Sequence, residues 1–109
     1  MPPATLSATA RRDMMAAASW IAGDSLKASR RFQMELRQAL ALLGSFPMTG
    51  ASRPEHAPEP YRFSLLPGFP YVLVYNCQRR PPVIMRILHG SQDLPEILST
   101  LPSADDSAP

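Results

Sequence analysis

The chain has 109 residues, of which 45% are hydrophobic, and its formal net charge is only +2. This composition excludes a wholly disordered protein and predicts one domain with a single modest core. No apolar run approaches the length of a membrane span, so the sequence predicts no membrane partner.

The first half of the chain predicts a short strand followed by two helices. Residues 4–7 favour a strand, and Ser7 can cap a helix over 8–23, because its hydroxyl can accept a backbone N–H of the first turn. The strongest helical pattern covers 24–44, where one apolar stripe recurs at helical spacing: Ala28, Phe32, Leu36, Ala39, Leu40 and Leu43. The connection between the two helices is very short, so we expect them to pair antiparallel as a helical hairpin.

The second half predicts a sheet. Residues 45–60 are rich in Pro, Gly, Ser and Ala and lack periodicity, which indicates a loop. Three strands should follow as an antiparallel meander, over 61–66, 71–77 and 83–89, and the near-continuous apolar character of the second strand is typical of a central position. Residues 93–101 predict a short C-terminal helix. The expectation is therefore one two-layer α+β domain over 1–101, of order β-α-α-β-β-β with a short final helix, and a flexible polar tail over 102–109.

Five segments of the sequence resemble one protein family: "LSATARRDMMAAASWIA", "ASRRFQMELRQALALL", "FPMTG", "PYVLVY" and "IMRILHGSQD". In this order and spacing the chain is similar to the RelE/ParE superfamily of toxins from bacterial toxin–antitoxin systems, and closest to its ParE branch. The resemblance covers about residues 5 to 98 and implies a helical hairpin on an antiparallel sheet. It also implies a toxin that inhibits growth and is neutralised by a cognate antitoxin. ParE-like members inhibit DNA gyrase, whereas RelE-like members are ribonucleases that cut messenger RNA on the ribosome.

A metal-independent ribonuclease of this kind needs acid–base groups and cations around the scissile phosphate. The candidate residues are Arg62, Tyr75, Arg86 and His89. Odd spacing along a regular strand, however, puts Arg86 and His89 on opposite faces. The structural interpretation is that His89 bonds locally at the end of a strand, and that Arg86 pairs with a carboxylate such as Asp93 and orders the C-terminal turn.

The basic residues favour gyrase inhibition over messenger cleavage. The resemblance implies that ribonuclease members concentrate lysine and arginine on the sheet, whereas the only lysine here, Lys27, lies in a predicted helix. A second alternative is a degenerate, non-toxic domain that binds nucleic acid or protein. No cofactor is expected, and two distant histidines with the one cysteine, Cys77, do not form a metal-ligand set.

The distribution of charge indicates the kind of partner. All eleven basic residues and only five of the nine acidic residues lie at or before Ser91, and ten of the eleven are arginine. This excess favours an acidic antitoxin lying along the hairpin and the sheet, near Trp20, Arg31, Phe32 and Arg37. A lone cysteine and the lack of the basic-then-apolar order of a signal peptide predict a cytoplasmic location.

Overall fold

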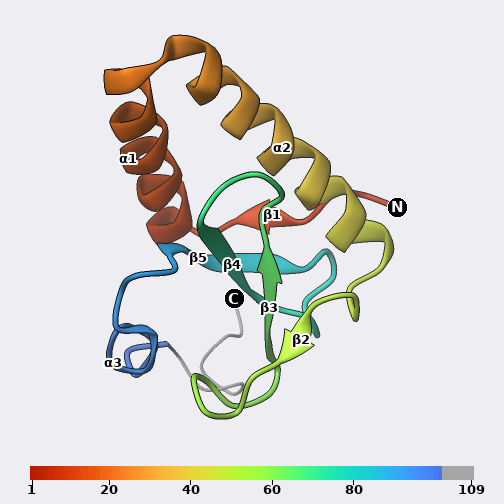
Figure 1. The fold of residues 1–109 in the computed structure, drawn as a ribbon. Coiled ribbons are helices and arrows are strands. Elements are labelled where there is room, and N and C mark those ends of the chain that lie inside the picture. The colour runs from red at the N-terminus through yellow and green to blue at the C-terminus, as the bar shows by residue number, and fades with distance from the viewer. Residues whose placement is uncertain (102–109) are drawn as a thin grey trace.

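The computed structural model describes residues 1–101, in which two helices pack on one face of a five-stranded sheet (Figure 1). The elements in chain order are β1 (Thr5–Leu6), α1 (Ala8–Asp24), α2 (Leu26–Ser45), β2 (Ala51–Ser52), β3 (Tyr61–Leu65), β4 (Tyr71–Asn76), β5 (Val83–His89) and α3 (Leu94–Leu98). The predicted α+β fold is confirmed. The predicted polar tail over 102–109 lies outside the described residues.

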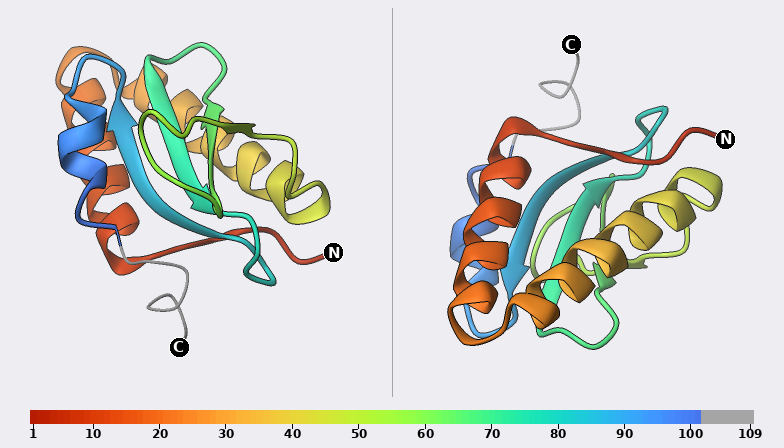
Figure 2. Two further views of the ribbon diagram at one scale, coloured as in Figure 1. Left: turned by 90° about the horizontal axis from the view of Figure 1, so that it is seen from below. Right: turned by 90° about the horizontal axis from the view of Figure 1, so that it is seen from above.

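Serine side chains set the start of both long helices. The hydroxyl of Ser7 accepts the backbone N–H of Ala10 at 3.0 Å and thereby caps α1. Ser25 is at once the C-cap of α1 and the N-cap of α2, so a single residue joins the two helices. The predicted helical hairpin therefore forms, and the two helices diverge from this connection across the sheet (Figure 2).

The sheet order is β1-β5-β4-β3-β2, with β1 parallel to β5 and every other neighbour antiparallel. The prediction that 45–60 is entirely loop is wrong, because β2 pairs there with β3. A two-residue strand is too short to leave a periodic pattern in the sequence.

The central strand β4 is buried on both faces, as its continuous apolar sequence predicted. On the helix-facing side, Phe32 and Leu36 of α2 pack in one core cluster with Leu73 of β4. The 53–60 loop and α3 lie on the opposite face of the sheet (Figure 2). A second cluster forms there from Ala57, Tyr61, Phe63, Val72, Val74, Leu88 and Leu98. The helical hairpin covers only one face of the sheet, and the 53–60 loop and α3 cover the core on the other face.

Strand β5 contains a β-bulge. Val74 of β4 lies opposite Arg86, but the next residue, Tyr75, lies opposite Ile84, so Met85 is an extra residue on β5. This extra residue allows Ile84 and Ile87 to join the same helix-facing cluster although they are three positions apart.

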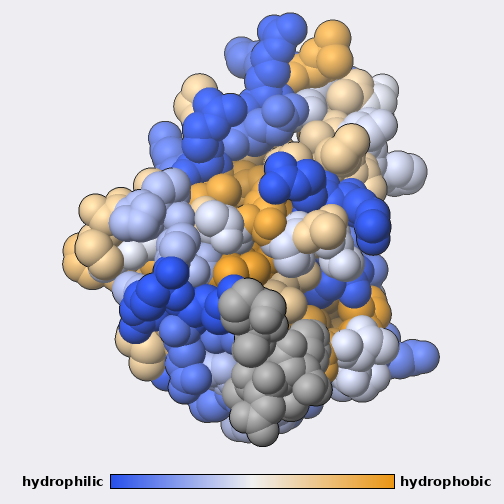
Figure 3. All heavy atoms as spheres, turned by 180° about the vertical axis from the view of Figure 1, so that it is seen from behind, coloured by the Kyte–Doolittle hydropathy of each residue, from blue (hydrophilic) through white to orange (hydrophobic). Residues whose placement is uncertain are grey.

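Several large hydrophobic side chains remain on the surface. Seen from behind, hydrophobic residues reach the surface in the middle of the molecule, between hydrophilic ones (Figure 3). Within residues 1–101, the large hydrophobic residues that are more than half exposed are Met1, Met15, Trp20, Leu26, Met34, Phe46, Met48 and Leu65. Such residues are candidates for contact with other molecules where they adjoin a groove or cavity.

Candidate functional site

Tyr75 and Arg62, two of the four ribonuclease candidates, anchor the loop that follows α2. The hydroxyl of Tyr75 donates to the carbonyl of Pro47 at 2.6 Å and accepts the N–H of Gly50 at 2.8 Å. Arg62 lies opposite Tyr75 in the sheet, donates to the carbonyl of Gly50 at 2.9 Å and pairs with Glu59 at 3.3 Å. Both side chains therefore hold the backbone of the "FPMTG" segment in place.

Burial makes Tyr75 a poor acid–base group. Its side chain is fully enclosed, and this burial raises the pKa of the phenol, which the hydrogen bond from Gly50 lowers only in part. Gly50 is required beside it, because a Cβ atom at this position would lie 2.5 Å from the Tyr75 hydroxyl oxygen. The glycine of "FPMTG" thus has a packing role against Tyr75.

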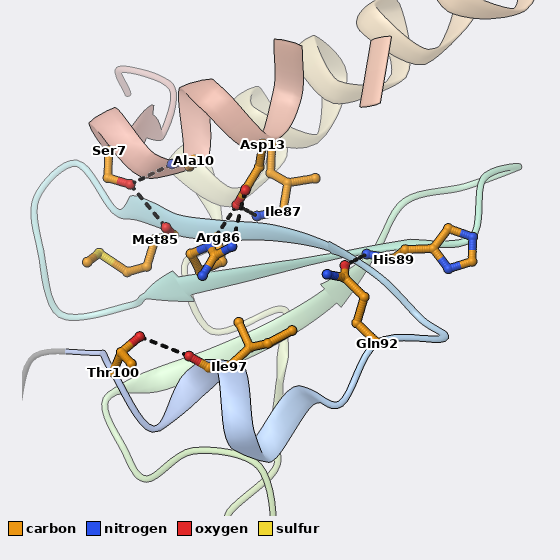
Figure 4. A network of polar contacts seen from close by, with 10 residues as sticks. All are labelled: Ser7, Ala10, Asp13, Met85, Arg86, Ile87, His89, Gln92, Ile97 and Thr100. Carbon is orange, nitrogen blue, oxygen red and sulfur yellow. Dashed lines mark hydrogen bonds and ion pairs between the residues drawn. The ribbon is translucent and has the colours of Figure 1, made fainter. Parts of the chain in front are cut away.

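Arg86 is paired with Asp13, in the first half of α1. Its Nε lies 2.8 Å and its Nη2 3.2 Å from the two carboxylate oxygens, a bidentate arrangement (Figure 4). The same carboxylate accepts the backbone N–H of Ile87 at 3.0 Å. The prediction that Arg86 pairs with a carboxylate is confirmed. The suggestion that this carboxylate is Asp93, and that Arg86 orders the C-terminal turn, is wrong, because α1 lies along β5 and brings Asp13 closer, while Asp93 caps α3.

His89 closes the turn after β5. Its Nδ1 accepts the N–H of Ser91 at 3.1 Å. Its own backbone N–H donates to Oε1 of Gln92 at 2.7 Å (Figure 4). Its ring meets that of Tyr71 edge-on, with 5.3 Å between centroids. The structural interpretation of His89 as a locally bonded residue at the end of a strand is confirmed.

The four ribonuclease candidates do not converge on one point. His89 lies opposite Tyr71, whereas Arg62 lies opposite Tyr75, four residues further along β4. At about 3.3 Å per residue this separates the two ends by about 13 Å. Arg86 lies opposite Val74, whose side chain belongs to the face turned away from the helices, while His89 shares the helix-facing side with Tyr71. Only Arg62 and Tyr75 meet, and they meet at the loop that they anchor.

The residues predicted to bind a partner divide into exposed and buried ones. Trp20 on α1 is 79% exposed, and Arg31 and Arg37 are exposed on α2. Phe32 is fully buried, with its ring centroid 5.4 Å from those of Phe69 and Tyr71. It therefore has no exposed surface with which to contact a partner protein. The helical periodicity that places Phe32 in the apolar stripe of α2 already indicated that its side chain is buried.

Trp20 and the basic residues border two depressions on the helices. Trp20 lines a groove of about 310 Å³ between α1 and the end of β5, together with Ala17, Ile87 and His89. On α2, a depression of about 510 Å³ is bordered by Lys27, Arg30, Arg31 and Met34, which recur at helical spacing on one face. This basic face of α2, with Arg37 one turn further, suits an acidic partner.

Sequence reasoning missed two features that lie at the sheet edges. The first is Asp13, which pairs with Arg86 of β5. The signal in the sequence was its place beside the apolar stripe of α1, because a carboxylate there lies close to the sheet that the stripe covers. The second feature is a cavity of about 420 Å³ beside β3. We call it the β3-edge cavity; its walls include Ala51, Arg53, His56, Phe63, Leu65, Val72 and Leu94.

Within residues 1–101, no group of three or more His, Cys, Asp or Glu side chains is placed to hold a metal ion. The helices of this same range are all too short or too polar to span a membrane.

One comparison with known proteins gives a match. The family model described as "ParE toxin of type II toxin-antitoxin system, parDE" matches residues 4–94, from the residue before β1 to the first residue of α3. No curated protein matches the chain. The matched range includes the loop anchored by Tyr75, the Asp13–Arg86 pair and the turn closed by His89.

Proposed function

Since the chain belongs to the ParE toxin family of type II toxin–antitoxin systems, we propose that it inhibits bacterial growth by binding DNA gyrase and is neutralised by a cognate antitoxin. The family implies an antitoxin partner. The gyrase target is the further step, and it calls for a binding surface on the toxin.

The observation that carries the proposal is that each acid–base candidate is already committed to the fold. Tyr75 is buried against Pro47 and Gly50, and Arg86 is held by Asp13. His89 has its Nδ1 bonded to the backbone of the turn. A ribonuclease would need these groups free and close together around one phosphate, whereas a toxin that traps gyrase needs only a complementary surface.

For the antitoxin, we propose a contact along the exposed side of the hairpin, at Trp20, Arg31 and Arg37. Trp20 supplies apolar area at the groove between α1 and β5, and the two arginines lie on the basic face of α2. The basic excess before Gln92 suits an acidic segment that orders on binding, with charge raising the association rate.

The gyrase proposal is tested by inducible expression in a bacterial host, followed by assays with the purified chain, gyrase and supercoiled plasmid. We expect growth arrest, an SOS response and accumulation of gyrase-linked, linear DNA. Rapid ribosome-dependent cleavage of messenger RNA, lost in His89→Ala or Arg86→Ala, would contradict the proposal and favour the enzyme. Soluble expression with no growth defect would contradict toxicity itself.

The antitoxin surface is tested with a charge-reversed pair. Arg31→Glu with Arg37→Glu should slow association with the product of the neighbouring gene, and the effect should shrink as salt is raised. Arg11→Glu with Arg12→Glu is the matched control, because it changes the charge equally on exposed positions of α1. Equal slowing by both pairs would show that net charge acts, with no role for the basic face of α2.

A further inference from the structure

The outer edge of β3 is paired over only part of its length. β2 covers it with two residues, Ala51 and Ser52, opposite Phe63 and Arg62. At the far end, Leu66 donates its N–H to Tyr71 on the β4 side. Because the backbone groups of a strand alternate between its two neighbours, the N–H and C=O of Leu65 point away from β4, toward the outer edge.

Leu65 therefore marks an open strand edge. β2 ends before it reaches this position, and within residues 1–101 no backbone hydrogen bond to Leu65 is present on that side. The Leu65 side chain is 80% exposed. An edge of this kind is a template for pairing with another extended chain.

The β3-edge cavity opens beside this edge, on the face of the sheet turned away from the helices. Its floor is apolar and includes Phe63, Val72 and Leu94. Leu65 is two residues from Phe63, so its side chain projects to the same face and forms the rim of the cavity. At about 420 Å³ the cavity is larger than one aliphatic side chain requires.

The charge of the cavity is positive. Arg53 is the one Arg, Lys, Asp or Glu in its lining, and it forms no ion pair with any other residue of the described range. His56 also lines the cavity, with its ring 5.8 Å from that of Phe63, and its buried Nδ1 lacks a hydrogen-bond partner.

We infer that this edge binds an extended, acidic segment of a partner protein by strand addition. The segment exchanges main-chain hydrogen bonds with Leu65, and two apolar side chains at positions i and i+2 occupy the β3-edge cavity. A carboxylate on the same face of the segment pairs with Arg53. This inference is independent of gyrase as the target, because it depends on the edge, the cavity and the charge alone.

A second copy of the chain is a less suitable occupant. In a symmetric pairing of two β3 edges, each copy would bring its own Arg53 to the shared interface, and like charges there are unfavourable. On the other side of the sheet, Asp13 and Gln92 already bond the outward N–H groups of Ile87 and His89 on β5, so within residues 1–101 these two groups are not open to strand addition.

The experiment uses the purified chain and a labelled synthetic heptapeptide, Thr-Val-Thr-Leu-Thr-Glu-Thr, which presents Val, Leu and Glu on one face when extended. We expect saturable binding by fluorescence anisotropy and slower hydrogen exchange of the Leu65 amide in the complex. Leu65→Pro should abolish binding while the chain stays folded, because the N–H that it removes is not donated to β4. A peptide N-methylated at the amides that face Leu65 tests the same bonds with the protein unchanged.

Charge exchange tests the role of Arg53. Arg53→Glu should weaken binding about tenfold, the size expected for one charge-assisted hydrogen bond. A peptide with Lys in place of Glu should bind the Arg53→Glu variant better than it binds the original chain. The control variant, Arg11→Glu, should bind both the Glu peptide and the Lys peptide as the original chain does. Binding that survives Leu65→Pro without protection of the Leu65 amide would overturn the inference. A dimer of the chain that Leu65→Pro dissociates would overturn it too, because the occupant would then be a second copy.

Discussion

Along β5, beyond the end of β1, side chains bond one carbonyl and two backbone N–H groups, whereas at the β3 edge the backbone groups of Leu65 stay open. Ser7 donates its hydroxyl to the carbonyl of Met85, Asp13 accepts the N–H of Ile87, and Gln92 accepts the N–H of His89. No described residue does the same for Leu65 at the other edge. Side-chain capping of one edge confines strand addition to the other.

The course of the chain explains the contrast. β1 leads directly into α1, which therefore lies along β5 and carries Asp13 to its edge. On the other side, the chain leaves α2 and is held at Pro47 and Gly50 by the Tyr75 hydroxyl. It joins the sheet only at Ala51, too late to pair with Leu65. The anchoring of one loop thus decides where the sheet remains open.

The largest expected effect comes from breaking the closed edge. Asp13→Ala leaves the Arg86 guanidinium and the Ile87 N–H without their acceptor, in a place where the two charged side chains are only 16% and 22% exposed. The free energy of unfolding should fall by about 2 to 4 kcal/mol. Urea denaturation measures this, with Asp24→Ala, an exposed carboxylate of the same helix, as the control.

Asp13→Asn refines the same test. The amide oxygen can still accept the Ile87 N–H, but the charge that faces Arg86 is lost, so the stability should lie between the original chain and Asp13→Ala. A loss below about 1 kcal/mol for Asp13→Ala would mean that the β5 edge does not depend on this carboxylate.

The second effect concerns the anchor that shapes the open edge. Gly50→Ala places a methyl group 2.5 Å from the Tyr75 hydroxyl oxygen and 3.0 Å from the carbonyl oxygen of Phe63. We expect a loss of about 1 to 3 kcal/mol, the usual cost of overpacking. In a double-mutant cycle, Tyr75→Phe should reduce the cost of Gly50→Ala, because it removes the nearest of these atoms. Strict additivity of the two changes would contradict the contact.

The parts of this fold that the sequence could predict are those with local patterns. The stripe through Phe32 and Leu36 predicted which face of α2 is buried, and the apolar run of β4 predicted a central strand. Ser7 was identified as a cap because capping involves residues only three positions apart.

The features missed depend on contacts between distant segments. Asp13 and Arg86 are 73 positions apart, and which carboxylate reaches the arginine depends on where α1 lies beside β5. The extra residue Met85 and the two-residue strand β2 leave no periodic signal. The open edge at Leu65 could not be foreseen either, because it depends on where the neighbouring strand stops.

A smaller effect sharpens the role of the anchor through pH. Burial raises the pKa of Tyr75 in the folded chain, while in the unfolded chain the phenol titrates near its usual value of about 10. Above that pH the unfolded chain loses a proton that the folded chain retains, so the free energy of unfolding should fall by at most about 1.4 kcal/mol per pH unit. This contribution is constant below pH 9. Urea denaturation between pH 8 and 11 should show a shallower decline for Tyr75→Phe; parallel curves would argue against a protonated, buried Tyr75.

The smallest effect on stability should come from the open edge itself. Leu65→Lys replaces a side chain that is 80% exposed, at a residue whose backbone forms no hydrogen bond on its outer side within residues 1–101. The free energy of unfolding should change by no more than about 0.5 kcal/mol, as for Met48→Lys, an exposed residue of the anchored loop. A loss of several kcal/mol would mean that Leu65 is packed, and the contrast between the two edges would fail. If stability is unchanged while the heptapeptide binds more weakly, Leu65 contributes to recognition and not to the fold.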